Sequence, residues 1–129
     1  MGKAMNIKDY VKTVLKREMS YLGSIERLSE KPIRILHASM GLATESGEIL
    51  EQIKKHIFYG KPLDEVNLVE ECGDLLWYMA VMLDSIGVSF EEVMEANDRK
   101  LELRYRSKFT DNAANNRDLK AERKALEDG

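Results

Sequence analysis

The sequence predicts an all-α protein of four main helices arranged as a bundle, and three observations lead to this fold class. Apolar residues recur at spacings of three and four along most of the chain, and no segment alternates between apolar and polar residues. The two prolines, Pro32 and Pro62, leave long stretches in which helices can continue. A length of 129 residues with 43% hydrophobic side chains suits one domain with its own core.

Capping residues place the first two predicted helices. The first begins after Asn6, a residue that favours the N-cap position. The pattern weakens from Gly23 to Pro32, where we expect a break. The second helix begins near Pro32, since proline suits a first helical turn, and runs to about Phe58 before the stop signal Tyr59-Gly60-Lys61-Pro62.

The third predicted helix runs from about Leu63 to Ile86 and ends at Gly87. Ser89 followed by Glu92 is a capping box, which opens a fourth helix that reaches about Arg106. The composition then becomes polar. Residues 117–127 allow a surface helix, an oligomer contact or no stable structure. We therefore expect one helical domain over residues 1–106 and a polar C-terminal extension, a tail or an extra helix, over residues 107–129.

Charge and composition exclude several classes of partner. The formal net charge is -3 and the pI is near 5.5, without the basic face that a nucleic-acid polymer requires. One cysteine, Cys72, permits no intrachain disulfide and suits a reducing compartment. We see no signal peptide and no apolar run long enough to cross a membrane. These features predict a cytoplasmic protein without a membrane partner.

Two pairs of acidic residues carry the chemical signal. Glu45 and Glu48 are three residues apart on the second helix, and Glu71 and Asp74 are three apart on the third. Each pair spans roughly 60° around its helix and projects from one face. The short connection makes the two helices antiparallel neighbours, so the two acidic faces can meet. Four facing carboxylates become tolerable around a hard divalent cation, for which magnesium or manganese is the best match.

Glycines and histidines refine this interpretation. Gly41, Gly47 and Gly73 lie near the acidic pairs, and mid-helix glycines suggest a close approach of another backbone or a ligand. Neither histidine, His37 or His56, follows a glutamate by three residues, which argues against a ferritin-like iron site. The alternative is that both acidic faces are solvated, because the chain has 23 acidic residues, and that the glycines only allow tight helix packing.

Three runs of sequence resemble a known family. HASMGLATESGEILEQIKK, LVEECGDLLWYMAVMLDSIGVSFEEV and NDRKLELRY are similar to the MazG-like branch of the all-α NTP pyrophosphatases, a superfamily that includes dimeric dUTPases and phosphoribosyl-ATP pyrophosphohydrolase. The family pattern is E-x-x-E, a spacer and E-x-x-D. Glu45, Glu48, Glu71 and Asp74 fill it completely. The resemblance covers about residues 34–106.

The resemblance implies an enzyme with a MazG fold. Such enzymes hydrolyse a nucleoside triphosphate between the α and β phosphates, release the monophosphate and pyrophosphate, depend on Mg²⁺ and assemble as homodimers or homotetramers. The all-oxygen donor set also allows Mn²⁺ as a substitute. Metal ions can neutralise charge on the phosphates and activate a water molecule. Glu48 is our candidate to orient or deprotonate that water, although spacing does not separate a metal ligand from a base.

Further polar residues are candidates for substrate binding. Asn97, Lys100 and Arg104 share one face of the fourth helix and suit phosphate or sugar oxygens. Tyr78 lies one turn after Asp74 and can stack on a base. His37 and Lys55 lie on the arc of the second helix that carries the first acidic pair. For each, the alternative is a structural or solvated side chain, and for Trp77 we favour packing.

Three functions follow from these observations. The first is hydrolysis of canonical or modified (deoxy)nucleoside triphosphates for nucleotide-pool control or housecleaning. The second is a dUTPase or dCTPase of the same superfamily. The third is a non-catalytic helical interaction module, against which the complete set of four carboxylates argues.

Overall fold

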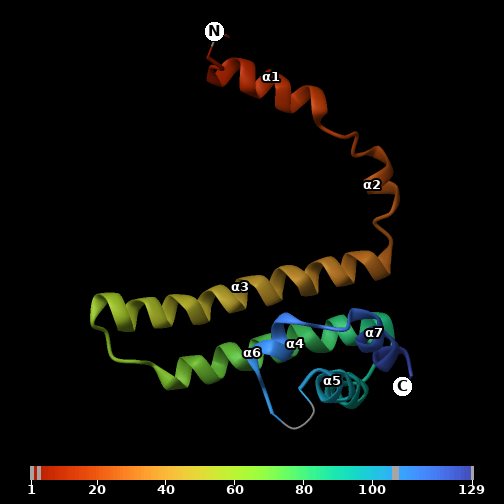
Figure 1. Ribbon diagram of the computed structural model, residues 1–129. Helices are drawn as coiled ribbons and strands as arrows, with labels where there is room; N and C mark the ends of the chain where they lie inside the picture. Colours follow the sequence, from red (N-terminus) through yellow and green to blue (C-terminus); the bar gives the residue numbers. More distant parts are fainter. Residues whose placement is uncertain (1, 3, 106–107, 129) are drawn as a thin grey trace. The chain divides into compact units, whose positions relative to one another are not determined.

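The structure is a computed structural model, and it describes residue 2, residues 4–105 and residues 108–128 (Figure 1). Helices account for all of the regular structure in these ranges, which confirms the all-α fold class. The helices are α1 (Ile7–Arg17), α2 (Leu22–Glu26), α3 (Glu30–Tyr59), α4 (Glu65–Ile86), α5 (Phe90–Tyr105), α6 (Asp111–Asn115) and α7 (Leu119–Glu127).

The chain divides into two compact units, Met1–Ile33 and Arg34–Gly129. In the first unit, the Asn6 side chain accepts a hydrogen bond from the Asp9 amide and caps α1, as predicted. The break expected from Gly23 to Pro32 is shorter than predicted, because the single turn of α2 forms inside it and α3 begins at Glu30.

In the second unit, α3 and α4 run antiparallel beside each other (Figure 1). Gly60 ends α3 with a φ of 66°, and the Lys61 amide donates to the Lys55 carbonyl across this cap. Asp64 caps α4, and Gly87 ends it with a φ of 73°. Both glycines adopt the left-handed conformation that a helix C-terminus favours, so the predicted turn and stop are confirmed.

The last three helices also belong to the second unit. Ser89 and Glu92 form the predicted capping box, with reciprocal hydrogen bonds of 2.7 and 3.1 Å, at the start of α5. The predicted end of this helix near Arg106 and the predicted domain boundary between residues 106 and 107 lie outside the described residues. Beyond them, α6 and α7 form in the predicted extension, and both pack against α5.

Few apolar side chains in the described ranges are fully covered. Ala38 and Leu83 are the buried hydrophobic residues there, whereas many large apolar side chains of α3 and α4 are exposed. None of the described helices combines the length and hydropathy needed to cross a membrane.

Candidate metal centre

Three of the four predicted carboxylates gather where α3 and α4 face each other. Glu45 of α3 and Glu71 and Asp74 of α4 each contribute one oxygen, and these oxygens all lie within 4.8 Å of one another. We call these three residues the acidic triad. Its exposure is graded, because Glu71 is buried, Glu45 is half-buried and Asp74 is exposed. The helical spacing of three residues places Glu71 and Asp74 on one face of α4, as the sequence predicted.

The closeness of the carboxyl groups changes the pKa of one member of the triad, Glu45. The pKa of Glu45 is raised above its ordinary value, first by a hydrogen bond with the Glu71 carboxyl, then by loss of hydration and by the negative charges of Glu71, Asp74 and Glu48. Negative charges this close to Glu45 oppose the ionisation of its carboxyl group. A divalent cation would relieve the repulsion, and carboxylate oxygens are the ligands that Mg²⁺ and Mn²⁺ prefer. The donor set therefore fits a hard cation.

Glu48 occupies a different position from the triad. Its side chain is exposed, and its ligand oxygen is not among the three that converge. Its charge nevertheless contributes to the raised pKa of Glu45. Glu48 therefore lies near Glu45 without joining the three converging oxygens.

An aromatic group forms one wall of the centre. Tyr78 and Trp77 line an open hollow of about 290 Å³ together with Glu45 and Asp74. The Trp77 and Tyr78 rings meet edge to face with their centroids 5.0 Å apart, and the His37 ring also meets the Tyr78 ring edge to face at 5.7 Å. Trp77 is 58% exposed, so it is not a core residue. Its predicted packing is limited to the contact with the Tyr78 ring.

Glycines contribute to this wall at one position only. A Cβ atom on Gly41 would overlap the Tyr78 ring, which confirms the close approach expected there. At Gly47 and Gly73 no heavy atom of the described residues lies within 4 Å of the place a Cβ would take, so neither α3 nor α4 approaches the other closely there, and the approach of a ligand or a second copy stays a prediction. In the second unit, these two glycines border open space.

One neighbour of the triad was not predicted from the sequence. Asn67 lies one turn before Glu71 on α4, and its side-chain Nδ2 donates to Glu71 Oε1 at 3.2 Å. The spacing of four residues carries the signal, since it places both side chains on the same helix face.

The basic candidates have partners of their own. Lys55 lies 3.9 Å from Glu51, an ion pair within α3. Arg104 donates two hydrogen bonds, of 2.8 and 2.7 Å, to the carboxylate of Glu122 on α7. No hydrogen bond or ion pair within the described ranges joins Asn97 or Lys100 to the acidic triad. Their substrate contacts stay predictions.

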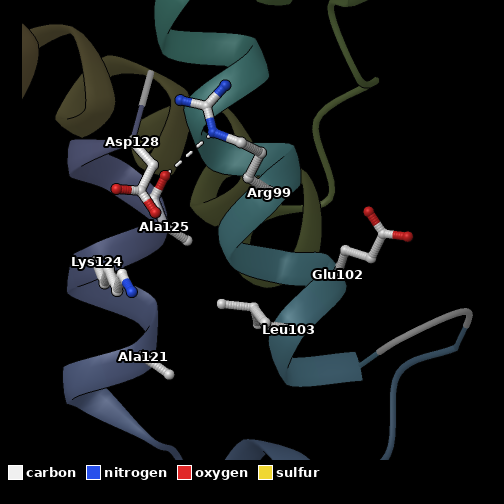
Figure 2. A pocket seen from close by; sticks show the side chains of 7 residues that line it. All are labelled: Arg99, Glu102, Leu103, Ala121, Lys124, Ala125 and Asp128. Atoms are coloured by element: carbon white, nitrogen blue, oxygen red, sulfur yellow. Dashed lines mark hydrogen bonds between the residues drawn. The ribbon is translucent and has the colours of Figure 1, made fainter.

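A second hollow, of about 480 Å³, lies between α5 and α7 (Figure 2). Arg99 reaches across it, and its Nε donates to the Ala125 carbonyl at 3.1 Å. Two basic and two acidic side chains line it together with alanines and Leu103, and among the described residues they form no convergent set of metal ligands. The lining residues are Arg99, Glu102, Leu103, Ala121, Lys124, Ala125 and Asp128. This hollow therefore lacks the cluster of converging carboxylates that makes the triad a candidate metal site.

Comparison with known proteins agrees with the geometry. A family model described as the MazG nucleotide pyrophosphohydrolase domain matches residues 36–109, more than half of the chain. The match includes the acidic triad, Glu48 and all of α5, and ends before α6 and α7. No curated protein and no solved structure matches the chain.

Proposed function

The chain belongs to the MazG nucleotide pyrophosphohydrolase family, and from this premise we propose that it hydrolyses (deoxy)nucleoside triphosphates to the monophosphate and pyrophosphate. The convergence of Glu45, Glu71 and Asp74 within 4.8 Å is the observation that carries the proposal. Carboxylates do not bind a triphosphate directly because both are negatively charged, so the site requires a cation between them.

We propose that Glu45, Glu71 and Asp74 hold Mg²⁺, or Mn²⁺ in its place, with Glu48 as a fourth ligand or as a base. When bound, the cation neutralises charge on the phosphates and lowers the pKa of a coordinated water molecule. The exposed position of Glu48 at the edge of the triad supports the role of base, since its carboxylate is free to orient or deprotonate a water molecule.

The aromatic residues beside the triad are suited to binding the base of the nucleotide. Tyr78 and Trp77 offer ring faces and edges beside the triad, suited to stacking on a base, and His37 supports the Tyr78 ring from α3. We propose that the phosphates extend from the triad toward cationic residues. Lys55 is a candidate because it is exposed and its ion pair with half-buried Glu51, at 3.9 Å, is weak.

One face of α5 carries polar and basic residues that could contact the phosphates. We propose Asn97, Lys100 and Arg104 for this role, in line with the family resemblance. Glu122 neutralises one of the two guanidinium groups around it, those of Arg104 and Arg117, so the three side chains together retain one positive charge. Arg104→Ala tests the assignment, because loss of a phosphate contact raises KM, whereas a purely structural role changes thermal stability alone.

We propose that the active form is a homodimer or homotetramer. Exposed apolar residues follow a three-four spacing along α4, with Val66 82%, Val69 73% and Leu76 60% exposed. Gly73 lies in the same stripe and borders open space, so a second copy can approach the helix closely there. A continuous apolar stripe of this kind is typical of a protein–protein interface.

A panel of nucleotides tests the proposed reaction and its substrate. The purified chain is incubated with each NTP and dNTP and either Mg²⁺ or Mn²⁺, and the products are identified by chromatography. We expect monophosphate and pyrophosphate from several nucleotides, as suits nucleotide-pool control or housecleaning in the cytoplasm. Turnover of dUTP or dCTP alone would identify the dUTPase or dCTPase alternative. No turnover with either metal would leave a non-catalytic helical module.

A further inference from the structure

The side-chain amide of Asn67 has a hydrogen-bonded nitrogen and, in the described part of the chain, an oxygen without a hydrogen-bond donor. Its Nδ2 donates to Glu71 Oε1 at 3.2 Å and lies 3.4 Å from Glu70 Oε2. Its Oδ1 is buried and, among the described residues, has no hydrogen-bond partner. A buried carbonyl oxygen without a donor destabilises the fold, so this arrangement requires a reason.

The two glutamates fix the orientation of the amide. Turning it over would place Oδ1 against Glu70 and Glu71, and oxygen would then face oxygen without a proton between them. The observed orientation therefore satisfies the carboxylates and leaves Oδ1 without a donor. Because Glu71 is only 8% exposed, bulk water does not readily replace the hydrogen bond that Asn67 supplies.

We propose that Asn67 is a positioning residue of the metal centre, which holds Glu71 in its ligating orientation and accepts a hydrogen bond at Oδ1 when a hydrated cation binds. The proposal rests on the function proposed above. A carboxylate ligand requires a fixed orientation, and such supporting hydrogen bonds are a general feature of metal sites. Mg²⁺ and Mn²⁺ keep several water molecules when they bind, and each of these is a donor suited to Oδ1.

Binding of Mn²⁺ without nucleotide tests this role independently of activity. The full chain is titrated with Mn²⁺, and free Mn²⁺ is measured by electron paramagnetic resonance. We expect Asn67→Ala to weaken binding roughly 10- to 100-fold, the range found when outer partners of metal ligands are removed. Asn67→Gln, which keeps the amide on a longer side chain, should recover part of this loss. Asn112→Ala removes an amide on α6 and should leave the affinity within about twofold of wild type.

Thermal unfolding separates positioning from simple stabilisation. Asn67→Ala removes the donor to buried Glu71, but it also removes the unsatisfied Oδ1 and introduces a stronger helix former, so we expect at most a small fall in the metal-free Tm. The rise in Tm on adding Mn²⁺ should become smaller. A lower metal-free Tm together with unchanged Mn²⁺ affinity would show a structural role only and would overturn the proposal.

The remaining outcomes distinguish this proposal from the proposed function. If wild type releases pyrophosphate while Asn67→Ala binds Mn²⁺ with wild-type affinity, the role of Asn67 is wrong and the function stands. If Asn67→Ala weakens Mn²⁺ binding but wild type hydrolyses no nucleotide, the function is wrong and the role of Asn67 stands. Wild-type protein that binds no Mn²⁺ would contradict both.

Discussion

The Tyr78 ring lies against the backbone of Gly41, in the space that a side chain at position 41 would fill. This contact joins α4 to α3 one turn before Glu45, and it holds an aromatic ring on the wall of the hollow beside the acidic triad. The absence of a Cβ at this position thus allows the Tyr78 ring to border the hollow beside the acidic triad.

Gly41→Ala tests the importance of this contact. The added methyl group forces the Tyr78 ring to move, and such overpacking costs typically about 1–3 kcal/mol. We expect a lower free energy of unfolding in chemical denaturation and slower pyrophosphate release, because the ring no longer borders the triad. Gly47→Ala is the matched control on the same helix. Its methyl group enters open space, and we expect a gain of about 0.5–1 kcal/mol from the better helix former. Equal stability of the two variants would contradict this explanation.

Glu122→Gln tests the attachment of the C-terminal helix. Glu122 is 4% exposed and accepts hydrogen bonds from Arg104 and Arg117, which hold its pKa well below the ordinary value. A carboxyl group with a lowered pKa stabilises the fold above the pKa of the unfolded state, and this stabilisation is lost as the pH falls toward the folded-state pKa. We expect the variant to have a clearly lower Tm at pH 7.

The same residue makes a prediction about pH. The difference in Tm between wild type and Glu122→Gln should narrow as the pH falls below about 4.5, where the unfolded carboxyl takes up its proton. Thermal unfolding followed by circular dichroism across pH 3–7 measures this directly. A difference in Tm that stays constant over the range would show that the carboxylate charge does not hold α7 on α5.

Leu76→Lys tests the apolar stripe on α4 as an interface between copies. The substitution places a charge in the middle of the stripe, where Leu76 is 60% exposed. We expect the molar mass measured by light scattering to fall to that of a single chain, because a buried unpaired lysine opposes association. Leu119→Lys changes a residue of α7 with a similar exposure, 64%, and should leave the mass unchanged. A single-chain mass already in wild type would contradict the proposed oligomer.

Local sequence signals predicted most of the fold. Asn6, Gly60, Gly87 and the Ser89–Glu92 capping box act within a few residues of their own positions, so the sequence reveals where each helix begins or ends. The turn of α2 was missed because helices this short lack an apolar period. The structure of the extension also depended on a distant partner, since Glu122 meets Arg104 across 18 residues.

In the candidate site, too, local features could be predicted from the sequence, whereas contacts between helices could not. Spacings of three predicted that Glu71 and Asp74 share one face, and the short connection at Gly60 predicted that Glu45 lies opposite them. Contacts between helices were harder to infer. Nothing in the sequence distinguishes Gly41, which receives the Tyr78 ring, from Gly47, which borders open space. Such differences depend on the rotation of each helix about its axis.

The most direct test of the central claim compares pyrophosphate release by two aspartate variants of α4. Asp74→Asn removes a charge from the acidic triad, and we expect a loss of at least about a hundredfold with Mg²⁺, because a metal site contributes several kcal/mol to catalysis. Asp84→Asn removes a charge from an exposed ion pair with Arg34, worth at most about 1 kcal/mol, and should retain nearly full activity. Wild-type release by Asp74→Asn would contradict the assignment of the triad as the catalytic metal centre.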